Sequence, residues 1–178
     1  MTMPADFEGR LSQGALWEAW VGAVLSRCGL YTLHHPAVVG GERDHSVSLD
    51  LEVFPFHPLQ KPNVKVKRSF SPSEDGFSSE VKSSQLSFTG PDDYPMPTVL
   101  VCAQDSWMNK WPGKETVQRD FLLVSRVTGH LVWVPVGTKV QMNHPVHDRN
   151  RNYSYKCVVV NREQLRPFQD FVAKVKSG

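Results

Sequence analysis

The chain has 178 residues and a formal net charge of +2, and 40% of its residues are hydrophobic and 21% charged. These values exclude an intrinsically disordered chain and a strongly basic one, and the length allows one domain that buries about 70% of the surface exposed when unfolded. No apolar run approaches the about 18 residues of a membrane span, and the N-terminus lacks a signal-peptide pattern. We expect a single domain over residues 1–178, with no membrane partner.

Three cysteines, Cys28, Cys102 and Cys157, are odd in number, far apart in the sequence and without a CxxC spacing. This pattern argues against both a disulfide framework and a structural zinc site. We therefore expect a reducing compartment and a cytoplasmic protein.

The first half of the chain predicts one helix followed by strands. Residues 9–28 are rich in Ala, Leu and Trp, contain no proline and end at Gly29, which favours a helix. Residues 31–39 and the alternating stretch "HSVSLDLEVF", residues 45–54, predict a hairpin. Residues 55–77 combine prolines with the basic run "KPNVKVKRS" and predict an inserted basic loop or hairpin.

The middle of the chain predicts strands separated by loops. Strand patterns occur at residues 78–88 and 98–104, and the second of them, "TVLVCAQ", is typical of a central strand that is covered on both sides. Residues 105–120 read as a loop. Residues 121–136 predict a hairpin that turns at Thr128 and Gly129.

The C-terminal part predicts a strand and a closing helix. Residues 142–152 are polar and basic and read as a loop, whereas the stretch that follows them predicts a strand. Residues 161–175 have helical apolar spacing, with Asn161 as the N-cap. The expected fold is α/β, with a central mixed sheet of about five or six strands flanked by an N-terminal and a C-terminal helix.

The stretch "SSEVKSS" places two ionisable residues on one face of a strand. Because side chains alternate along a strand, Glu80 and Lys82 point the same way, and Val81 points into a core. Asp50 and Glu52 likewise share a face of the preceding strand. Pairing these strands brings Asp50 and Glu80 together, which is repulsive unless a cation neutralises them or one takes a proton. Carboxylate oxygens are ligands that Mg²⁺ prefers, and an adjacent lysine can stabilise or deprotonate a metal-bound water or contact a phosphate.

Glu18 is the only charged residue between Leu11 and Ser26, and the helical period places it on the packed face of the first helix. A lone acid on such a face favours a metal, a water network or a basic partner. Gly14 and Gly22, one turn to either side, would let this helix approach a neighbour closely.

The order of these residues, Glu18 on a helix, Asp50 on a strand and Glu80-Val81-Lys82 on the next, resembles the PD-(D/E)xK nuclease superfamily. The resemblance covers about residues 9 to 107 and implies a restriction-endonuclease-like core, as in Holliday-junction resolvases. It implies that Asp50, Glu80 and Glu18 bind Mg²⁺, with Mn²⁺ as a substitute, and that Lys82 assists the attacking water.

This sequence departs from the family pattern at two points. Leu49 precedes Asp50 where the family often has proline, and about thirty residues separate the two acids, so that residues 55–77 would be an insertion. Gln85 is a further candidate. Glu52 is an alternative to Asp50 that the sequence leaves open.

Two basic clusters are candidates for nucleic-acid binding, because phosphates are neutralised by Lys and Arg. The plain alternative for both clusters is a solvated loop. The clusters are Lys61, Lys65, Lys67 and Arg68 in the insertion, and Arg149, Arg151 and Lys156 near the C-terminus, where tyrosines are interleaved.

We therefore expect a Mg²⁺-dependent deoxyribonuclease, with DNA as its partner and a structure-selective endonuclease of the junction-resolvase type favoured. A resolvase would also require a homodimer. Such an enzyme would be nucleoid-associated, or in the host cytoplasm if phage-encoded. One alternative is an inactive nuclease-like module that binds nucleic acid or protein, and another is zinc chemistry at His144 and His147.

Overall fold

The structure is a computed structural model that describes residues 4–34, 50–55 and 77–177. None of the helices in these ranges is long and apolar enough to cross a membrane. The elements, in chain order, are α1 (Pro4–Arg27), β1 (Tyr31–His34), β2 (Leu51–Phe54), β3 (Phe77–Ser84), β4 (Thr98–Ala103), α2 (Gln104–Lys110), β5 (Asp120–Ser125), β6 (Leu131–Val134), β7 (Gln141–Asp148), β8 (Tyr153–Asn161), the 3₁₀ turn η2 (Arg162–Gln164), β9 (Arg166–Pro167) and α3 (Phe168–Ser177).

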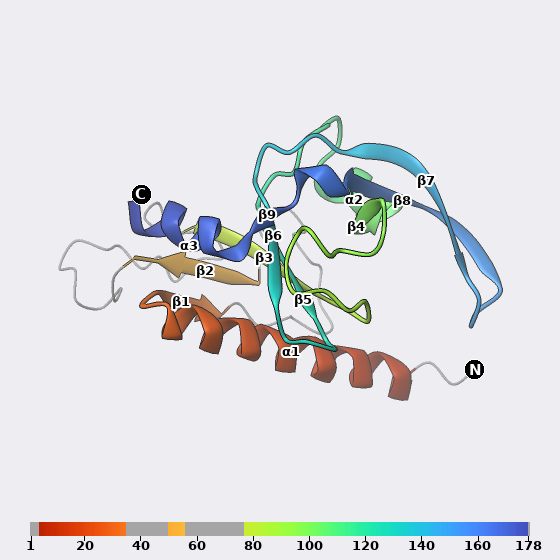
Figure 1. The fold of residues 1–178 in the computed structure, drawn as a ribbon. Coiled ribbons are helices and arrows are strands. Elements are labelled where there is room, and N and C mark those ends of the chain that lie inside the picture. Colours follow the sequence, from red (N-terminus) through yellow and green to blue (C-terminus); the bar gives the residue numbers. More distant parts are fainter. Residues whose placement is uncertain (1–3, 35–49, 56–76, 178) are drawn as a thin grey trace.

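The strands form two sheets. The larger sheet has six strands in the order β1-β2-β3-β5-β6-β9, and the smaller has three in the order β4-β8-β7. All the pairings are antiparallel except that of β3 with β5, which is parallel. The chain leaves β3, builds β4 and α2, and returns along β5 (Figure 1). The expected α/β fold, with a mixed sheet and a helix at each end of the chain, is confirmed.

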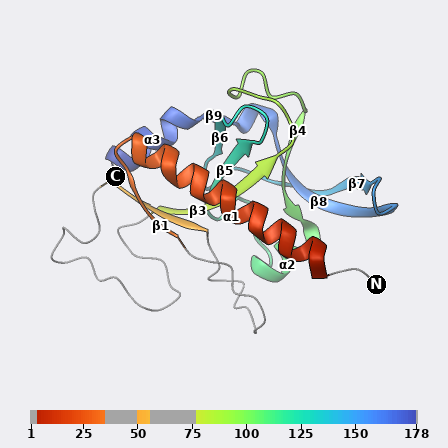
Figure 2. The same ribbon diagram turned by 90° about the horizontal axis from the view of Figure 1, so that it is seen from below.

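Two apolar cores lie on opposite faces of β5, whose six residues are all buried. Leu122 and Val124 pack with α1, α3 and β2 in one core. Phe121 and Leu123 pack with β4 and β8 in the other. Figures 1 and 2 show α1 along one face of the large sheet, with the small sheet beyond the opposite face. The continuous apolar run "FLLV" is therefore the strand covered on both sides.

That role was expected for "TVLVCAQ", and the expectation was wrong. Strand β4 instead pairs with β8 at one side of the small sheet. Leu100 on β4 is 46% exposed, while its neighbours Val99 and Val101 enter the core. An apolar run predicts burial, but whether both faces are covered depends on where the strand lies in its sheet.

Three expected local structures also differ from those observed. Gln104–Lys110 forms a helix where a loop was expected, and Gln141–Asp148 forms a strand where a polar loop was expected. The last helix begins only at Phe168, because Asn161 ends β8 and its side chain caps the short η2 turn instead. Pro167 lies in β9, where its missing N–H costs less than in a helix.

Two glycines, Gly22 and Gly129, lie at positions where a side chain would clash or strain the backbone. A Cβ on Gly22 would lie 2.8 Å from Nε2 of His34, so α1 approaches β1 as closely as expected there. A Cβ on Gly14 would meet no atom of another element within 4 Å among the described residues, so no close approach is seen there. Gly129 has a φ of +74° at the expected turn between β5 and β6, which confirms the hairpin.

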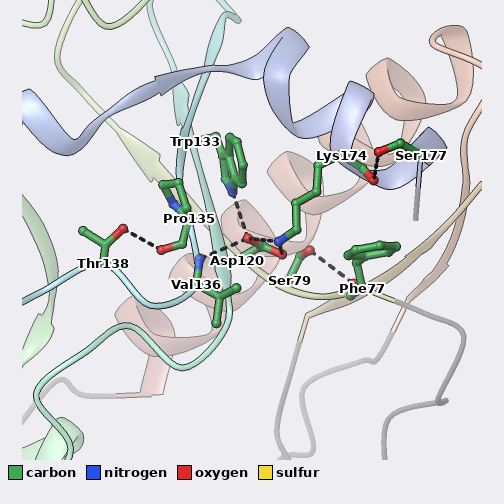
Figure 3. Close-up of polar contacts among 9 residues, drawn as sticks. All are labelled: Phe77, Ser79, Asp120, Trp133, Pro135, Val136, Thr138, Lys174 and Ser177. Carbon is green, nitrogen blue, oxygen red and sulfur yellow. Dashed lines mark hydrogen bonds and ion pairs between the residues drawn. The ribbon is translucent and has the colours of Figure 1, made fainter.

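An ion pair between the buried Asp120 and the partly exposed Lys174 connects α3 to the sheet (Figure 3). Asp120 accepts hydrogen bonds from Trp133 Nε1 at 2.9 Å and Val136 N at 3.1 Å, and its Oδ2 lies 2.9 Å from Lys174 Nζ. The lysine lies 5.4 Å from the centroids of the Phe77 and Trp133 rings. These contacts anchor α3 beside the first residue of β5.

Replacing Lys174 by methionine is expected to lower the free energy of unfolding by about 1–3 kcal/mol, because it leaves a buried carboxylate with neutral donors only. Urea unfolding measures the change. Lys176→Met, at an exposed position on the same helix, is the control and should change stability by less than about 0.5 kcal/mol. Equal effects of the two substitutions would contradict the role of the ion pair.

Candidate functional site

Asp50 lies beside Glu80 because β2 and β3 pair antiparallel. Leu51 is the partner of Ser79 in this register, so Asp50, which immediately precedes β2, comes next to Glu80 on β3. Oδ2 of Asp50 accepts a hydrogen bond from the backbone N–H of Val81 at 2.8 Å. Burial raises the pKa of Asp50, and the negative charge of Glu80 raises it further, although the Val81 hydrogen bond lowers it. The structure thus brings together the two acids paired in the sequence analysis.

Glu18 joins this pair through Asp50. It is half-buried on α1, and burial, followed by the charge of Asp50, raises its pKa from 4.5 to about 7. Asp50 is therefore the shared member of two repelling carboxylate pairs, one towards α1 and one within the sheet. No contact described in the structure joins Glu18 directly to Glu80, so the three acids form a row of two coupled pairs.

Lys82 lies two residues after Glu80 and is exposed, whereas Val81 packs against the core beneath α1. The lysine charge acts on Asp50 and also on Cys102 and Cys157, which lie on two strands of the small sheet. Burial raises the pKa of both thiols, and the lysine opposes this increase. Lys82 is thus an accessible cation where the two sheets meet.

Two cations that the sequence analysis missed contact Glu80. Lys110, at the end of α2, forms an ion pair with Glu80 Oε1, and Arg119 Nη1 lies 3.8 Å from the same oxygen. Both side chains lie near the ring of Trp111, with Lys110 Nζ 4.6 Å and Arg119 Cζ 5.9 Å from its centroid. Burial lowers the pKa of Arg119, and the charges of Glu80 and Asp50 raise it.

Sequence signals for these two residues did exist. Trp107 and Trp111 are four residues apart with no glycine or proline between them, which is the spacing of one helical turn and places Lys110 beside their face. Arg119 lies two residues before the apolar run "FLLV", where an arginine has little access to water. Their meeting with Glu80 still depended on the parallel pairing of β3 with β5, which no local pattern encodes.

The other candidate residues lie around or outside this site. Glu52 is buried and lies opposite Ser78, two residues along β2 from Asp50. Gln85 is exposed just after the end of β3. Arg149, Arg151 and Lys156 are all exposed on the β7–β8 hairpin. The residues of the expected insertion, Lys61, Lys65, Lys67 and Arg68, lie outside the described residues.

The three carboxylates are the right ligand type for a divalent cation, but their arrangement is less favourable. Carboxylate oxygens are the donors that Mg²⁺ prefers, and a cation would relieve both repulsions at Asp50. Glu80, however, already contacts Lys110, so a bound cation would have to share Glu80 with Lys110 or displace the lysine. Within residues 4–34, 50–55 and 77–177, no group of three or more His, Cys, Asp or Glu side chains is placed to hold a metal ion. His144 and His147 on β7 belong to no such group.

The raised pKa of Glu18 predicts a pH dependence of stability. Between about pH 4.5 and pH 7 the folded chain holds a proton at Glu18 that the unfolded chain has released, so stability falls as the pH rises through this range. Glu18→Gln removes this loss, and in EDTA at pH 8 it should raise the melting temperature by roughly 2–4 °C.

Melting curves from pH 4.5 to pH 8 measure this effect. Glu115→Gln, which removes an exposed carboxylate, is the control and should follow the parent at every pH. A Glu18→Gln curve parallel to that of the parent would show that Glu18 does not titrate abnormally.

In comparisons with protein-family models, curated proteins and solved structures, no match to this chain was found.

Proposed function

We propose that the chain is a Mg²⁺-dependent nuclease that hydrolyses DNA phosphodiester bonds at the Asp50–Glu80–Lys82 site. The observation that carries the proposal is the coupling of three carboxylates from three separate elements beside an exposed lysine. Such repulsion is costly for stability alone, and clusters of this kind are typical of functional sites. The resemblance to PD-(D/E)xK nucleases, drawn from the same residues, supports the same chemistry.

In this proposal Asp50, Glu80 and Glu18 would hold the metal. A bound Mg²⁺ supplies charge stabilisation at the phosphate and lowers the pKa of a coordinated water. Lys82, accessible beside Glu80, orients the attacking water or contacts the phosphate. The Val81 N–H fixes one oxygen of Asp50, and Lys110 and Arg119 hold the Glu80 carboxylate in place between them.

A second candidate function is a nuclease-like domain that binds nucleic acid without cutting it. The ion pairs of Glu80 favour this alternative, because Lys110 and Arg119 already supply positive charge at the carboxylate. In an inactive domain these two cations would replace the metal permanently, and the acids would act only as a charge network.

Titration of Mg²⁺ and Mn²⁺ separates the two candidates. The nuclease should cut supercoiled plasmid, single-stranded DNA or a four-way junction in the presence of metal and not in EDTA. Calorimetry on the same protein should show metal binding that Asp50→Asn weakens at least tenfold. A chain that neither binds the metal nor cuts any of these substrates would be the binding module.

A further inference from the structure

A pocket of about 520 Å³ lies between the start of α2 and the β7–β8 hairpin. Its volume is within the range of sites that hold one small ligand. Figures 1 and 2 show the hairpin extending away from the body of the chain. The hairpin residues that line the pocket, from Asp148 to Lys156, belong to the half of the hairpin that carries its turn. The side chains that line it and matter here are Gln104, Asp105, Arg151, Tyr153, Tyr155 and Lys156.

The aromatic part of this pocket is a pair of stacked tyrosines. The rings of Tyr153 and Tyr155 are nearly parallel, with 13° between their planes and 6.0 Å between their centroids. Tyr153 is 62% exposed, so one face of the stack is open to solvent. An exposed, preordered ring of this kind accepts a further flat ring at little entropic cost.

The charged part of the pocket suits a phosphate. Arg151 and Lys156 are exposed and line the pocket together with the tyrosines. Asp148 also lines the pocket. Its Oδ1 accepts from the backbone N–H groups of Asn150 and Arg151, at 3.0 and 3.3 Å, and its Oδ2 lies 3.8 Å from Nε of Arg151, so a bound phosphate would share the Arg151 guanidinium with Asp148. Stacking rings beside flexible cations are the combination by which proteins bind single-stranded nucleic acid.

The pocket opens on the same side of the small sheet as the candidate catalytic site. Tyr153, Tyr155 and Cys157 share one face of β8 because side chains alternate along a strand. Cys157 lies within reach of the charge of Lys82. Helix α2 begins at the pocket and ends at Lys110, which contacts Glu80.

Helix α2 connects the pocket to the candidate catalytic site along the chain. Its seven residues span roughly 10 Å, which is about three stacked nucleotides of one strand. A strand with one base at the tyrosines could therefore place a nearby phosphate beside Lys82.

We propose that this pocket binds an unstacked nucleobase, so that the substrate class is nucleic acid with a single-stranded or splayed segment. A base inside a duplex is covered by its neighbours and cannot reach the face of Tyr153, whereas a base in a single strand can. Arg151 and Lys156 hold the adjoining phosphates. The inference deepens the proposed function by naming its substrate, and the binding step requires no metal.

Fluorescence anisotropy in EDTA tests the pocket without cleavage. The probes are a labelled fifteen-nucleotide dT strand, the matching U strand and a blunt duplex of two separate strands without a loop. The parent should bind at least one single strand more tightly than the duplex. Tyr153→Ala/Tyr155→Ala should weaken single-strand binding about tenfold or more and leave duplex binding within about twofold.

Three variants control for folding and charge. Tyr153→Phe/Tyr155→Phe keeps the rings and should bind within about threefold of the parent. Tyr31→Ala, at a 40% exposed tyrosine on β1, should bind as the parent does. Arg151→Gln/Lys156→Gln should reduce the slope of log K against log salt for single strands by about 1.4.

The possible outcomes separate this inference from the proposed function. The pocket is overturned if Tyr153→Ala/Tyr155→Ala binds the single strand as tightly as the parent does, or if this variant loses as much affinity for the duplex as for the single strand. It is also overturned if Tyr153→Phe/Tyr155→Phe loses as much affinity for the single strand as the alanine variant does. A preference for single strand that the alanine pair abolishes supports the pocket, even where Mg²⁺ yields no cleavage and the nuclease proposal fails. The dT and U arms show whether the pocket prefers a DNA or an RNA strand.

Discussion

Lys82→Ala is expected to reduce metal-dependent DNA cleavage by about 10²–10³-fold while leaving the stability of the fold unchanged. Removing one charged group that acts on the reacting centre typically has an effect of this size. The side chain is exposed, so its truncation creates no cavity and should change the free energy of unfolding by less than about 0.5 kcal/mol. A time course on plasmid or single-stranded DNA at saturating Mg²⁺ measures the rate.

The matched control for this substitution is Lys114→Ala, at an exposed lysine in the segment between α2 and β5. It removes the same charge and should cut at the rate of the parent. Lys82→Arg keeps the charge in another shape and should retain part of the activity. Undiminished cleavage by Lys82→Ala would rule out any role of Lys82 in the reaction.

Glu80→Gln is expected to lower the free energy of unfolding in EDTA by about 2–3 kcal/mol, because it removes the carboxylate shared by two largely buried cations. The exposed fraction of the side chain is 14% for Glu80, 19% for Lys110 and 9% for Arg119, so water replaces little of the lost attraction. The same substitution should abolish detectable cleavage, since Glu80 is a proposed metal ligand.

Urea unfolding in EDTA measures the loss of stability independently of catalysis. Glu80→Gln/Lys110→Gln removes one of the two cations together with the acid and should recover part of that loss. Glu115→Gln provides the exposed comparison. A Glu80→Gln protein as stable as the parent would show that the ion pairs with Lys110 and Arg119 contribute nothing, which would also remove the main support for the inactive alternative.

The row of acids illustrates how much of a site can be predicted from sequence. Asp50, Glu80 and Lys82 could be paired because strand alternation and the antiparallel register are local regularities. Glu18 could be added because a lone charge on an apolar helix face needs a reason to be there. Strand alternation and the helical period are short-range, whereas the pairing of the two strands and the packing of α1 beside them are not, and the structure places all four residues in one neighbourhood.

The same reasoning failed wherever a contact depended on the arrangement of the sheets. Gln141–Asp148 looks like a loop because it is polar, yet it forms a strand by pairing with β8, and its exposure is what permits that polarity. "TVLVCAQ" was expected in the centre of the sheet, but the parallel partner of β3 is β5. Propensity describes a segment, whereas pairing partners are chosen among all the strands of the fold.

By itself the sequence determined the α/β class of the fold, a lone acid on the apolar face of the first helix and an acid-lysine strand, because periodicity and composition act over a few residues. Only the tertiary structure decided that Glu80 meets Lys110 and Arg119, and that Tyr153 and Tyr155 form an open stack near the same site. The crossover from β3 through β4 and α2 to β5 brings these residues together, and long-range pairing of this kind leaves no mark in the local pattern.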